Sequence, residues 1–424
     1  MRYERYKQTG IDWLGEVPEH WHRSKLKHEI NLVTDKARQD EEIRKYVGLE
    51  NVEPFTGRFK FENGEEPKIE GEALLFEKND VLFGKLRPYL AKCVIADFSG
   101  RCTFELLVMR PKTISNRYLF YLMLSDGFLK AIDSSTYGAK MPRASWGFIG
   151  NQLLYLPPVS EQYAIAKYLD CRVEKIDSII NAKQKQLDLL QQQRQAVISE
   201  AVTKGLDKNV PMKDSGIEWI GEVPKKWRVI KIKHLTKEII TGTTPTTQRE
   251  DYFDGNINWL TPADLTEGLK IKESKRKLDI KAILDGQARL FPTDTVVIVG
   301  IGATLGKVAL ITKGSSFNQQ LTGLICKKEK ILPEFLLYWL FVKSEAIKNM
   351  ASFTTLPILN NQTLREIAIV LPSISEQQKL IDYISNININ TDASIKSLFE
   401  QITKLKEYRQ SLIYEAVTGK IKIS

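Results

Sequence analysis

Two stretches of the chain repeat apolar residues at alternating spacings of three and four, which is typical of an α-helix that buries one narrow stripe. The first stretch has no Gly or Pro over residues 160–204, and its stripe includes Leu169, Val173, Ile176, Ile180, Leu187 and Leu190. The stripe of the second includes Ile395, Leu398, Ile402, Leu405 and Leu412. We predict two long helices whose stripes form a coiled-coil seam.

Each stripe also contains one arginine, Arg194 in the first and Arg409 in the second. A guanidinium that is buried without a partner is costly. We therefore expect each arginine to lie at the edge of the seam or opposite an acid.

The segments before these helices have a mixed pattern. Residues 80–83 and 295–299 resemble buried strands, whereas residues 118–129 and 334–348 have a helical period. Each segment is expected to fold as a compact domain with both helices and strands.

Short motifs recur around both segments. Residues 10–18 return at 216–224, with Trp13 matching Trp219, and residues 156–162 return at 371–377 with the shared pattern Leu-Pro-x-x-Ser-Glu-Gln. The first pair is offset by 206 residues and the second by 215. Between them the match is faint, as for residues 79–84 against 293–298. The chain is therefore two half-molecules in which similar frames hold divergent inserts.

Connectivity fixes how the helices must pair within one chain. Because the first helix ends where the second half begins, the two helices must run antiparallel. We predict an α+β fold: two globular α/β domains joined by two long antiparallel helices in an intramolecular coiled coil, with pseudo-two-fold symmetry. The expected segments are 1–155 (first frame and domain), 156–208 (first helix), 209–370 (second frame and domain) and 371–424 (second helix). A coiled coil between two chains is the alternative.

Composition points to a polyanionic partner. Lys and Arg number 62 against 52 Asp and Glu, a net charge of +10, which favours nucleic acid through counterion release. Cys93, Cys102, Cys171 and Cys326 have no metal-binding spacing, and no apolar run is long enough to cross a membrane. We expect a cytoplasmic protein with reduced thiols.

Basic and hydrogen-bonding residues gather near predicted turns in both domains. Arg and Lys suit guanine edges and phosphates, and Gln suits adenine. The candidate DNA-binding residues are Lys85, Arg87, Lys92, Lys140, Arg143, Ser145 and Trp146 in the first domain, and Thr243, Thr244, Thr246, Gln248, Arg249 and Lys307 in the second.

No catalytic signature is complete. Residues 300–307 resemble a phosphate-binding loop, but the spacing from Gly302 to Gly306 is one residue short, and Val308 replaces the required Ser or Thr. We predict a tight turn between strands there. The four histidines are not completed into a metal site or a catalytic triad, so we expect neither catalysis nor a bound metal or cofactor in this chain.

The doubled order of motifs resembles the specificity subunits of type I restriction–modification systems over essentially the whole chain. The motifs are Gly-x-x-Trp-x-Gly-x-x-Pro before each domain, Leu-Pro-x-x-x-Glu-Gln at its end, and Glu-Ala-Val-Thr closing each helix. The resemblance implies that each domain reads one half of a split, asymmetric site on double-stranded DNA, while the helices set the spacer and dock two methyltransferase subunits. It also implies S-adenosylmethionine in those partners, and ATP and Mg in two possible restriction–translocase subunits.

The sequence departs from the family pattern where the second domain opens. Thr243-Thr-Pro-Thr246 is similar to the family's Gly-Gly-Thr-Pro loop, but Thr replaces the second Gly. Two other functions are compatible with the sequence: a coiled-coil scaffold with two protein-binding heads, or a self-contained DNA-modifying enzyme. The first predicts no sequence-selective DNA affinity, and the second predicts activity from the chain alone.

Overall fold

A computed structural model describes residues 2–36, 45–61, 73–138, 140–265, 268–353 and 357–423. The chain divides into two compact units. The first unit comprises Met1–Lys185 and Leu398–Ser424, and the second comprises Gln186–Ser397. Each unit therefore contains part of both long helices.

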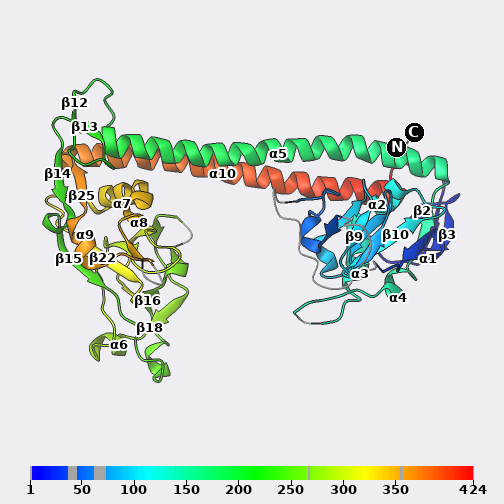
Figure 1. Ribbon diagram of the computed structural model, residues 1–424, viewed down its shortest axis with the longest axis horizontal. Coiled ribbons are helices and arrows are strands. Elements are labelled where there is room, and N and C mark those ends of the chain that lie inside the picture. The colour runs from blue at the N-terminus through cyan, green and yellow to red at the C-terminus, as the bar shows by residue number, and fades with distance from the viewer. Residues whose placement is uncertain are drawn as a thin grey trace. The chain divides into compact units, whose positions relative to one another are not determined.

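The first unit is built around a four-stranded sheet of order β4-β10-β7-β8, with a smaller sheet of order β5-β9-β6. Figure 1 labels β10 of the larger sheet and β9 of the smaller one. β1 pairs with β2, and β3 pairs with β11. The elements are β1 (Tyr6–Gln8), β2 (Glu16–Pro18), β3 (His22–Lys25), α1 (Leu26–Glu29), β4 (Ile30–Val33), β5 (Tyr46–Val47), η1 (Leu49–Asn51), β6 (Leu74–Phe76), β7 (Val81–Gly84), η2 (Pro88–Leu90), β8 (Cys93–Ile95), β9 (Gly100–Cys102), β10 (Leu106–Pro111), α2 (Asn116–Leu124), α3 (Asp126–Asp133), α4 (Trp146–Ile149), β11 (Leu153–Leu156) and α5 (Val159–Lys204).

The second unit repeats this plan with additional strands. Its main sheet has the order β15-β22-β19-β20-β17, and its smaller sheet has the order β18-β16-β21. The elements are β12 (Met212–Asp214), β13 (Glu222–Pro224), β14 (Arg228–Lys231), η3 (Ile232–His234), β15 (Thr236–Thr241), η4 (Glu250–Tyr252), β16 (Ile257–Leu260), η5 (Pro262–Asp264), β17 (Lys270–Ile271), β18 (Arg276–Leu278), α6 (Ile280–Leu284), β19 (Val296–Val299), β20 (Val308–Ile311), β21 (Ser315–Phe317), β22 (Leu321–Cys326), α7 (Pro333–Val342), α8 (Ser344–Lys348), β23 (Ser352–Phe353), β24 (Pro357–Ile358), α9 (Asn361–Glu366), β25 (Ala368–Leu371) and α10 (Ile374–Val417).

The strands correct the faint alignment of the two inserts. Val81 of β7 pairs with Met109, and Val296 of β19 pairs with Leu324, so equivalent positions here are 215 residues apart. The match of residues 79–84 to 293–298 was one residue out of register, a slip that would place every side chain on the opposite face of the sheet. Asn79 and Asp294, the true equivalents, share the left-handed backbone conformation, with φ of 75° and 64°.

Both predicted helices in the inserts are interrupted. Residues 118–129 are divided between α2 and α3 because Ser125 is extended, with ψ of 135°. Residues 334–348 are divided between α7 and α8 at Lys343. The apolar period continues across each break because both helices of a pair face the same core.

The repeated Gln of the frame motif holds the first insert helix of each unit. The side-chain oxygen of buried Gln162 accepts from the Ser115 backbone N–H at 2.8 Å, and its amide donates to the Pro157 carbonyl at 3.0 Å. Gln377 does the same with Leu332 and Pro372 at 2.8 and 3.0 Å. The motif is therefore a clamp that fixes the start of α2 and α7 to the start of the following long helix.

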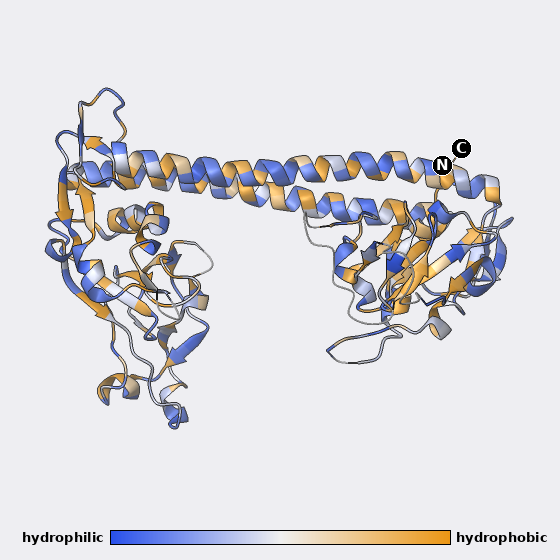
Figure 2. Cartoon of the chain, viewed as in Figure 1, coloured by the Kyte–Doolittle hydropathy of each residue, from blue (hydrophilic) through white to orange (hydrophobic). Residues whose placement is uncertain are grey.

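The two long helices pack together and run antiparallel. Asp177 of α5 meets Arg409 of α10 within the first unit, whereas Arg194 of α5 meets Asp392 of α10 within the second. A later position on α5 therefore contacts an earlier position on α10. Figure 2 shows polar and apolar residues alternating along both helices, as expected for helices with one buried stripe.

Both stripe arginines meet an acid, as predicted. The Arg409 Nε lies 2.8 Å from the Asp177 carboxylate, and the Arg194 Nη1 lies 2.7 Å from that of Asp392. The stripe residues Leu169, Val173, Ile176, Leu187, Leu398, Ile402 and Leu412 are buried, and Ile180, Leu190, Ile395 and Leu405 are half-buried.

The end of α10 packs on the N-terminal frame of the first unit. Tyr414 donates its hydroxyl hydrogen bond to the Trp13 carbonyl at 2.8 Å, and Val417 shares a core with Val17 and Trp21. Gly419 follows with φ of 70°, and a Cβ there would lie 2.4 Å from Pro18. The second unit repeats this packing where Ile198, at the end of α5, shares a core with Val223.

Candidate nucleic-acid interface

Most of the candidate residues lie along one edge of each main sheet. The C-terminal ends of β4 and β7 lie beside the N-terminal ends of β8 and β10, and β15, β19, β20 and β22 have the same arrangement. We call these the first and second loop edges. The first comprises residues 85–92, 103–105, 137–138 and 140–143, and the second comprises residues 243–249, 300–307 and 318–320.

Long-range pairing assembles the first loop edge. The Arg87 N–H donates to the Pro142 carbonyl at 2.8 Å, and the Ala144 N–H donates to the Lys85 carbonyl at 2.9 Å. Arg143 forms a bridge with Leu86. Residues more than 50 positions apart in the chain, Lys85 and Arg87 on one loop and Lys140 and Arg143 on another, therefore lie on one surface.

Arg143 is oriented by a carboxylate on the third loop. Its Nη2 and Nε lie 2.9 and 3.0 Å from the Glu105 Oε1, and this hydrogen bonding raises the pKa of the guanidinium. Both side chains remain partly exposed. The pair fixes the direction of Arg143 while its remaining donors can still reach a ligand.

The other candidates of the first domain are held in different ways. Ser145 caps α4 by accepting from the Phe148 N–H at 3.2 Å, and Trp146 is the first residue of that helix. Lys92 donates through Nζ to the Leu49 carbonyl, and burial lowers its pKa. Tyr89, Tyr137 and Met141 are exposed among the basic residues, so this surface combines cations with apolar side chains.

The two loop edges place different residue types at equivalent positions with positive φ. Arg87 and Ala91 adopt positive φ of 50° and 47°, and their equivalents 215 residues later are Gly302 and Gly306, with φ of 104° and 85°. Only Gly adopts this conformation without strain. Residues 300–307 form the turn between antiparallel β19 and β20, which confirms the predicted turn.

The second loop edge carries hydroxyl and amide groups. Thr243 donates to the Gln287 carbonyl at 3.0 Å, and Thr244 donates to the Gln319 side chain. The Thr246 hydroxyl accepts from the Gln248 N–H at 3.4 Å. Lys307 is exposed on the neighbouring turn.

Arg249 is engaged by carboxylates. Its Nη2 lies 2.7 Å from Asp251 and its Nη1 lies 3.3 Å from Asp285, and the guanidinium stacks over the Tyr252 ring at 4.3 Å. Hydrogen bonding to Asp251 raises the pKa of Arg249. These contacts anchor the end of the threonine-rich loop to η4 and to the end of α6.

Sequence reasoning missed two groups near the second loop edge. Asn318, Gln319 and Gln320 form the loop between β21 and β22, where Asn318 and Gln320 bond each other and Gln319 is exposed. Arg276 and Lys277 begin β18, directly after Lys275. The two adjacent glutamines and the run of five basic residues over positions 270–277 were visible signals, but only strand pairing brings them to this edge.

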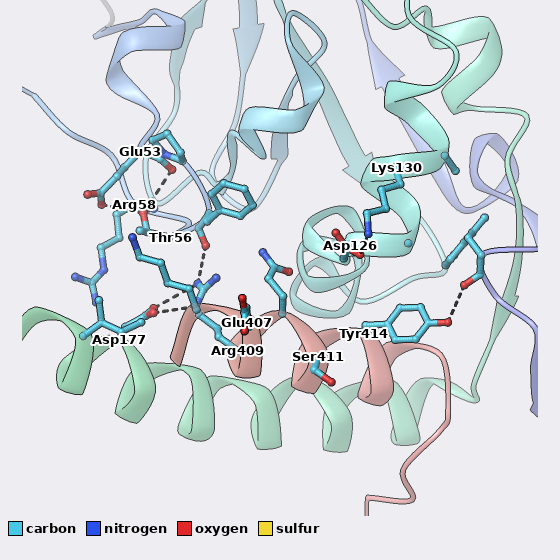
Figure 3. A pocket seen from close by; sticks show the side chains of 18 of the residues that line it. Glu53, Thr56, Arg58, Asp126, Lys130, Asp177, Glu407, Arg409, Ser411 and Tyr414 are labelled. Atoms are coloured by element: carbon cyan, nitrogen blue, oxygen red, sulfur yellow. Dashed lines mark hydrogen bonds and ion pairs between the residues drawn. The ribbon is translucent and has the colours of Figure 1, made fainter. Parts of the chain in front are cut away.

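A separate cavity of about 1530 Å³ lies within the first unit, between the first domain and its segments of α5 and α10 (Figure 3). Arg409 lies on its helical wall, with Nη2 donating to the Phe55 carbonyl at 2.6 Å. The cavity is lined by five acidic residues and four basic ones. The acidic residues are Asp12, Glu53, Asp126, Asp177 and Glu407, and the basic ones are Arg58, Lys130, Lys406 and Arg409. This balance gives no positive field for a DNA backbone.

Two further classes of site are absent from the described part of the chain. Among those residues, no three His, Cys, Asp or Glu side chains are grouped so that they could hold a metal ion. No helix formed by them is long and apolar enough to cross a membrane.

Comparison with known proteins places these features in context. The family model described as "Type I restriction modification DNA specificity domain" matches residues 18–189 and again 224–404. The MjaVIII type I restriction enzyme specificity subunit of Methanocaldococcus jannaschii is 27% identical over 433 residues, which cover 96% of this chain and 94% of that protein. The MjaIX specificity subunit of the same organism is 35% identical over 170 residues, 39% of each chain.

A solved structure has the same fold. A chain from a structure that describes the assembly and conformational transition of a type I restriction–modification system superposes with a TM-score of 0.74 at 18% identity, covering 96% of this chain and 99% of that chain. Each half of the present chain therefore matches one specificity domain.

Proposed function

The chain belongs to the type I restriction–modification DNA specificity family, and from this premise we propose that its two loop edges read the two halves of a bipartite, asymmetric site on double-stranded DNA. As the specificity subunit, the chain is the non-catalytic part of such an enzyme and has two target recognition domains. The proposal rests on one observation: equivalent loops on one shared topology carry different side chains in the two domains. Different donors and acceptors select different bases, so the two half-sites should differ.

In the first domain, the proposed readers are Arg87 and Arg143, supported by Lys85, Lys92 and Lys140. Arg87 occupies a left-handed position that its counterpart in the second domain leaves to Gly. A strained non-Gly residue at a ligand-facing loop is typical of a functional constraint. Ser145 and Trp146 place α4 beside this surface and complete the proposed contact set.

In the second domain, the proposed readers are hydroxyl and amide groups. Thr243, Thr244, Thr246 and Gln248 line one loop, and Gln319 lies against Thr244. Amide side chains can bond adenine in two places, and hydroxyls can bond most base edges. Lys307 suits a phosphate. Arg249 donates to Asp251, Asp285 and the Tyr252 hydroxyl, and its remaining Nη2 hydrogen is proposed to contact DNA.

The frames and helices have the remaining roles in the proposal. Residues 1–155 and 209–370 are the two frame and recognition segments, and residues 156–208 and 371–424 are the spacer segments. Their exposed helical faces would dock two methyltransferase subunits. In such complexes the cofactors belong to the partners, so S-adenosylmethionine would be bound there, and ATP and Mg would be used by restriction subunits where these are present.

The test is to purify the chain with the methyltransferase encoded beside it and map the methylated positions on random DNA. We expect a split motif with unequal halves. Arg87→Ala should relax selection only in one half, and Gln319→Ala only in the other, because each lies in one domain. Each variant is thus the matched control for the other.

Two outcomes would contradict the proposal. A complex that methylates without sequence preference would favour a scaffold with two protein-binding heads. Methylation or cleavage by the purified chain alone would favour a self-contained enzyme.

A further inference from the structure

A strand that carries a row of basic residues in the second unit has no counterpart strand in the described part of the first. β18 adds a strand beside β16 and begins with Arg276 and Lys277, directly after Lys275. In the first unit, the strand equivalent to β16 is β5, and among the described residues it pairs only with β9. The described parts of the two recognition domains therefore differ in the strand that presents basic residues beside the loop edge.

Contacts place this row next to the proposed base-reading loops. Arg276 faces Trp259 in the strand register, with its guanidinium 5.8 Å from the ring centroid. The Trp259 indole donates to the Thr243 carbonyl at 3.3 Å. One aromatic ring thus joins the start of β18 to the threonine-rich loop.

Strand direction gives the same placement. β16 runs parallel to β21, with Leu260 beside Phe317, and Asn318 follows directly. Because β18 is antiparallel to β16, its first residue lies at the end of the small sheet from which residues 318–320 emerge. Lys275 and Arg276 therefore flank the second loop edge.

The charges in the row are not equivalent. Lys277 is held by Glu273 and Asn258, whereas Lys275 and Arg276 are exposed. Lys275, Arg276 and Lys277 also border a hollow of about 580 Å³ with Thr247. Glu250 and Asp254 line the same hollow, where the three cations outnumber the two carboxylates.

We infer that Lys275 and Arg276 bind the phosphate backbone of DNA beside the half-site read by the second domain. This inference rests on the proposed function. Exposed cations that flank base-reading loops fix the position of the duplex without reading its sequence. They should therefore contribute to affinity on any sequence and to the dependence of binding on salt.

The test compares the double variant Lys275→Ala/Arg276→Ala with the wild type, each in complex with its methyltransferase partners. Binding is measured over a range of KCl concentrations on a duplex that carries the mapped site and on a scrambled duplex of equal length. Loss of two phosphate contacts should reduce the slope of log K against log salt by about 2. Affinity should fall by a similar factor on both duplexes, about 10-fold or more near physiological salt, and the methylated motif should not change.

The matched control is Lys328→Ala/Lys330→Ala, which removes the same charge beyond the C-terminal end of β22, on the opposite edge of the main sheet. It should leave the slope at the wild-type value. An unchanged slope in Lys275→Ala/Arg276→Ala would overturn the inference, as would a changed motif, because these residues would then be base readers. If the wild-type complex itself has no sequence preference, the proposed function fails instead.

Discussion

At the turn between β7 and β8, the first domain holds Arg87 and Ala91, whereas the turn between β19 and β20 of the second domain holds Gly302 and Gly306. One loop away, Arg143 pairs with Glu105 in the first domain, whereas the equivalent residues of the second are Ile358 and Gln320. Below these loops, β7 pairs with β10 in the same register in which β19 pairs with β22. The scaffold therefore tolerates replacement of the whole polar set at its edge, because those side chains contribute little to the core.

The helices show the same contrast between equivalent positions. Arg409 is 4% exposed, and it binds both Asp177 and the Phe55 carbonyl. Arg194, 215 residues earlier, has a side chain that is 33% exposed, and its partner Asp392 is 67% exposed. One sequence motif thus gives a buried ion pair in the first unit and a solvated one in the second.

The largest expected effect comes from removing the buried member of this pair. Arg409→Ala should lower the free energy of unfolding of the first unit by about 3–5 kcal/mol, because it leaves the Asp177 carboxylate and the Phe55 carbonyl without their partner. Arg194→Ala should lower the free energy of unfolding of the second unit by less than about 1 kcal/mol, since exposed ion pairs are screened by water and salt. Urea unfolding combined with hydrogen exchange, which assigns the loss to a unit, measures both. Equal losses would show that the two pairs are equivalent after all.

The next prediction concerns the strained turn. Arg87→Gly should weaken DNA binding by about 1–3 kcal/mol, yet leave the free energy of unfolding equal or raise it by up to about 1 kcal/mol, because Gly relieves the left-handed strain. Gly302→Ala is the converse control: a Cβ meets no heavy atom nearer than 3.5 Å, so the expected destabilisation of about 1–2 kcal/mol is conformational. Loss of both stability and binding in Arg87→Gly would indicate that Arg87 is structural.

The sequence predicted what is repeated, and it missed what depends on pairing across long separations. The two helices followed from their spacing, and the acidic partners of Arg194 and Arg409 followed from the cost of burying a charge. The alignment of Val296 with Val81 could not be predicted in this way, because a run of Val and Ile can slip by one residue without changing the apolar pattern. The breaks at Ser125 and Lys343 were hidden for a similar reason, since the apolar period continues across them.

The candidate site shows the same division. Lys85 and Arg143 were each identifiable as basic residues near a turn, but that they share a surface follows only from the bridge between Leu86 and Arg143. Asp285, the more distant of the two carboxylates that contact Arg249, lies 36 residues away in the chain and is brought near by the packing of α6 on η4. Residues 318–320 became candidates only when β22 was paired with both β15 and β19.

A smaller effect tests whether the frames are equivalent where the loop edges are not. Gln162→Ala and Gln377→Ala should each destabilise their own unit by about 1–3 kcal/mol, because each leaves buried backbone groups without a partner. Gln162→Met and Gln377→Met keep the side-chain volume but not the hydrogen bonds, and should lower the free energy of unfolding nearly as much. Hydrogen exchange at the start of α2 and α7 is the readout. A loss confined to one unit would mean that the shared motif has different roles in the two halves.

The smallest expected effect is a pH dependence that arises from one carboxylate of the second unit. Lys231 and Lys233 both bond Glu366 and lower its pKa from about 4.5 to about 2. Because the folded pKa lies below the unfolded one, the pair stabilises the fold above pH 4.5, and this contribution is lost as the pH falls toward 2. Glu366→Gln should therefore be slightly less stable than the wild type at neutral pH, and the difference should shrink below pH 4.5. The first unit has Asn151 at the equivalent position, beside Lys25 and Lys27, so Asn151→Glu should introduce the same pH dependence there. If the difference between Glu366→Gln and the wild type stays constant from pH 7 to pH 3, the two lysines do not act through this carboxylate.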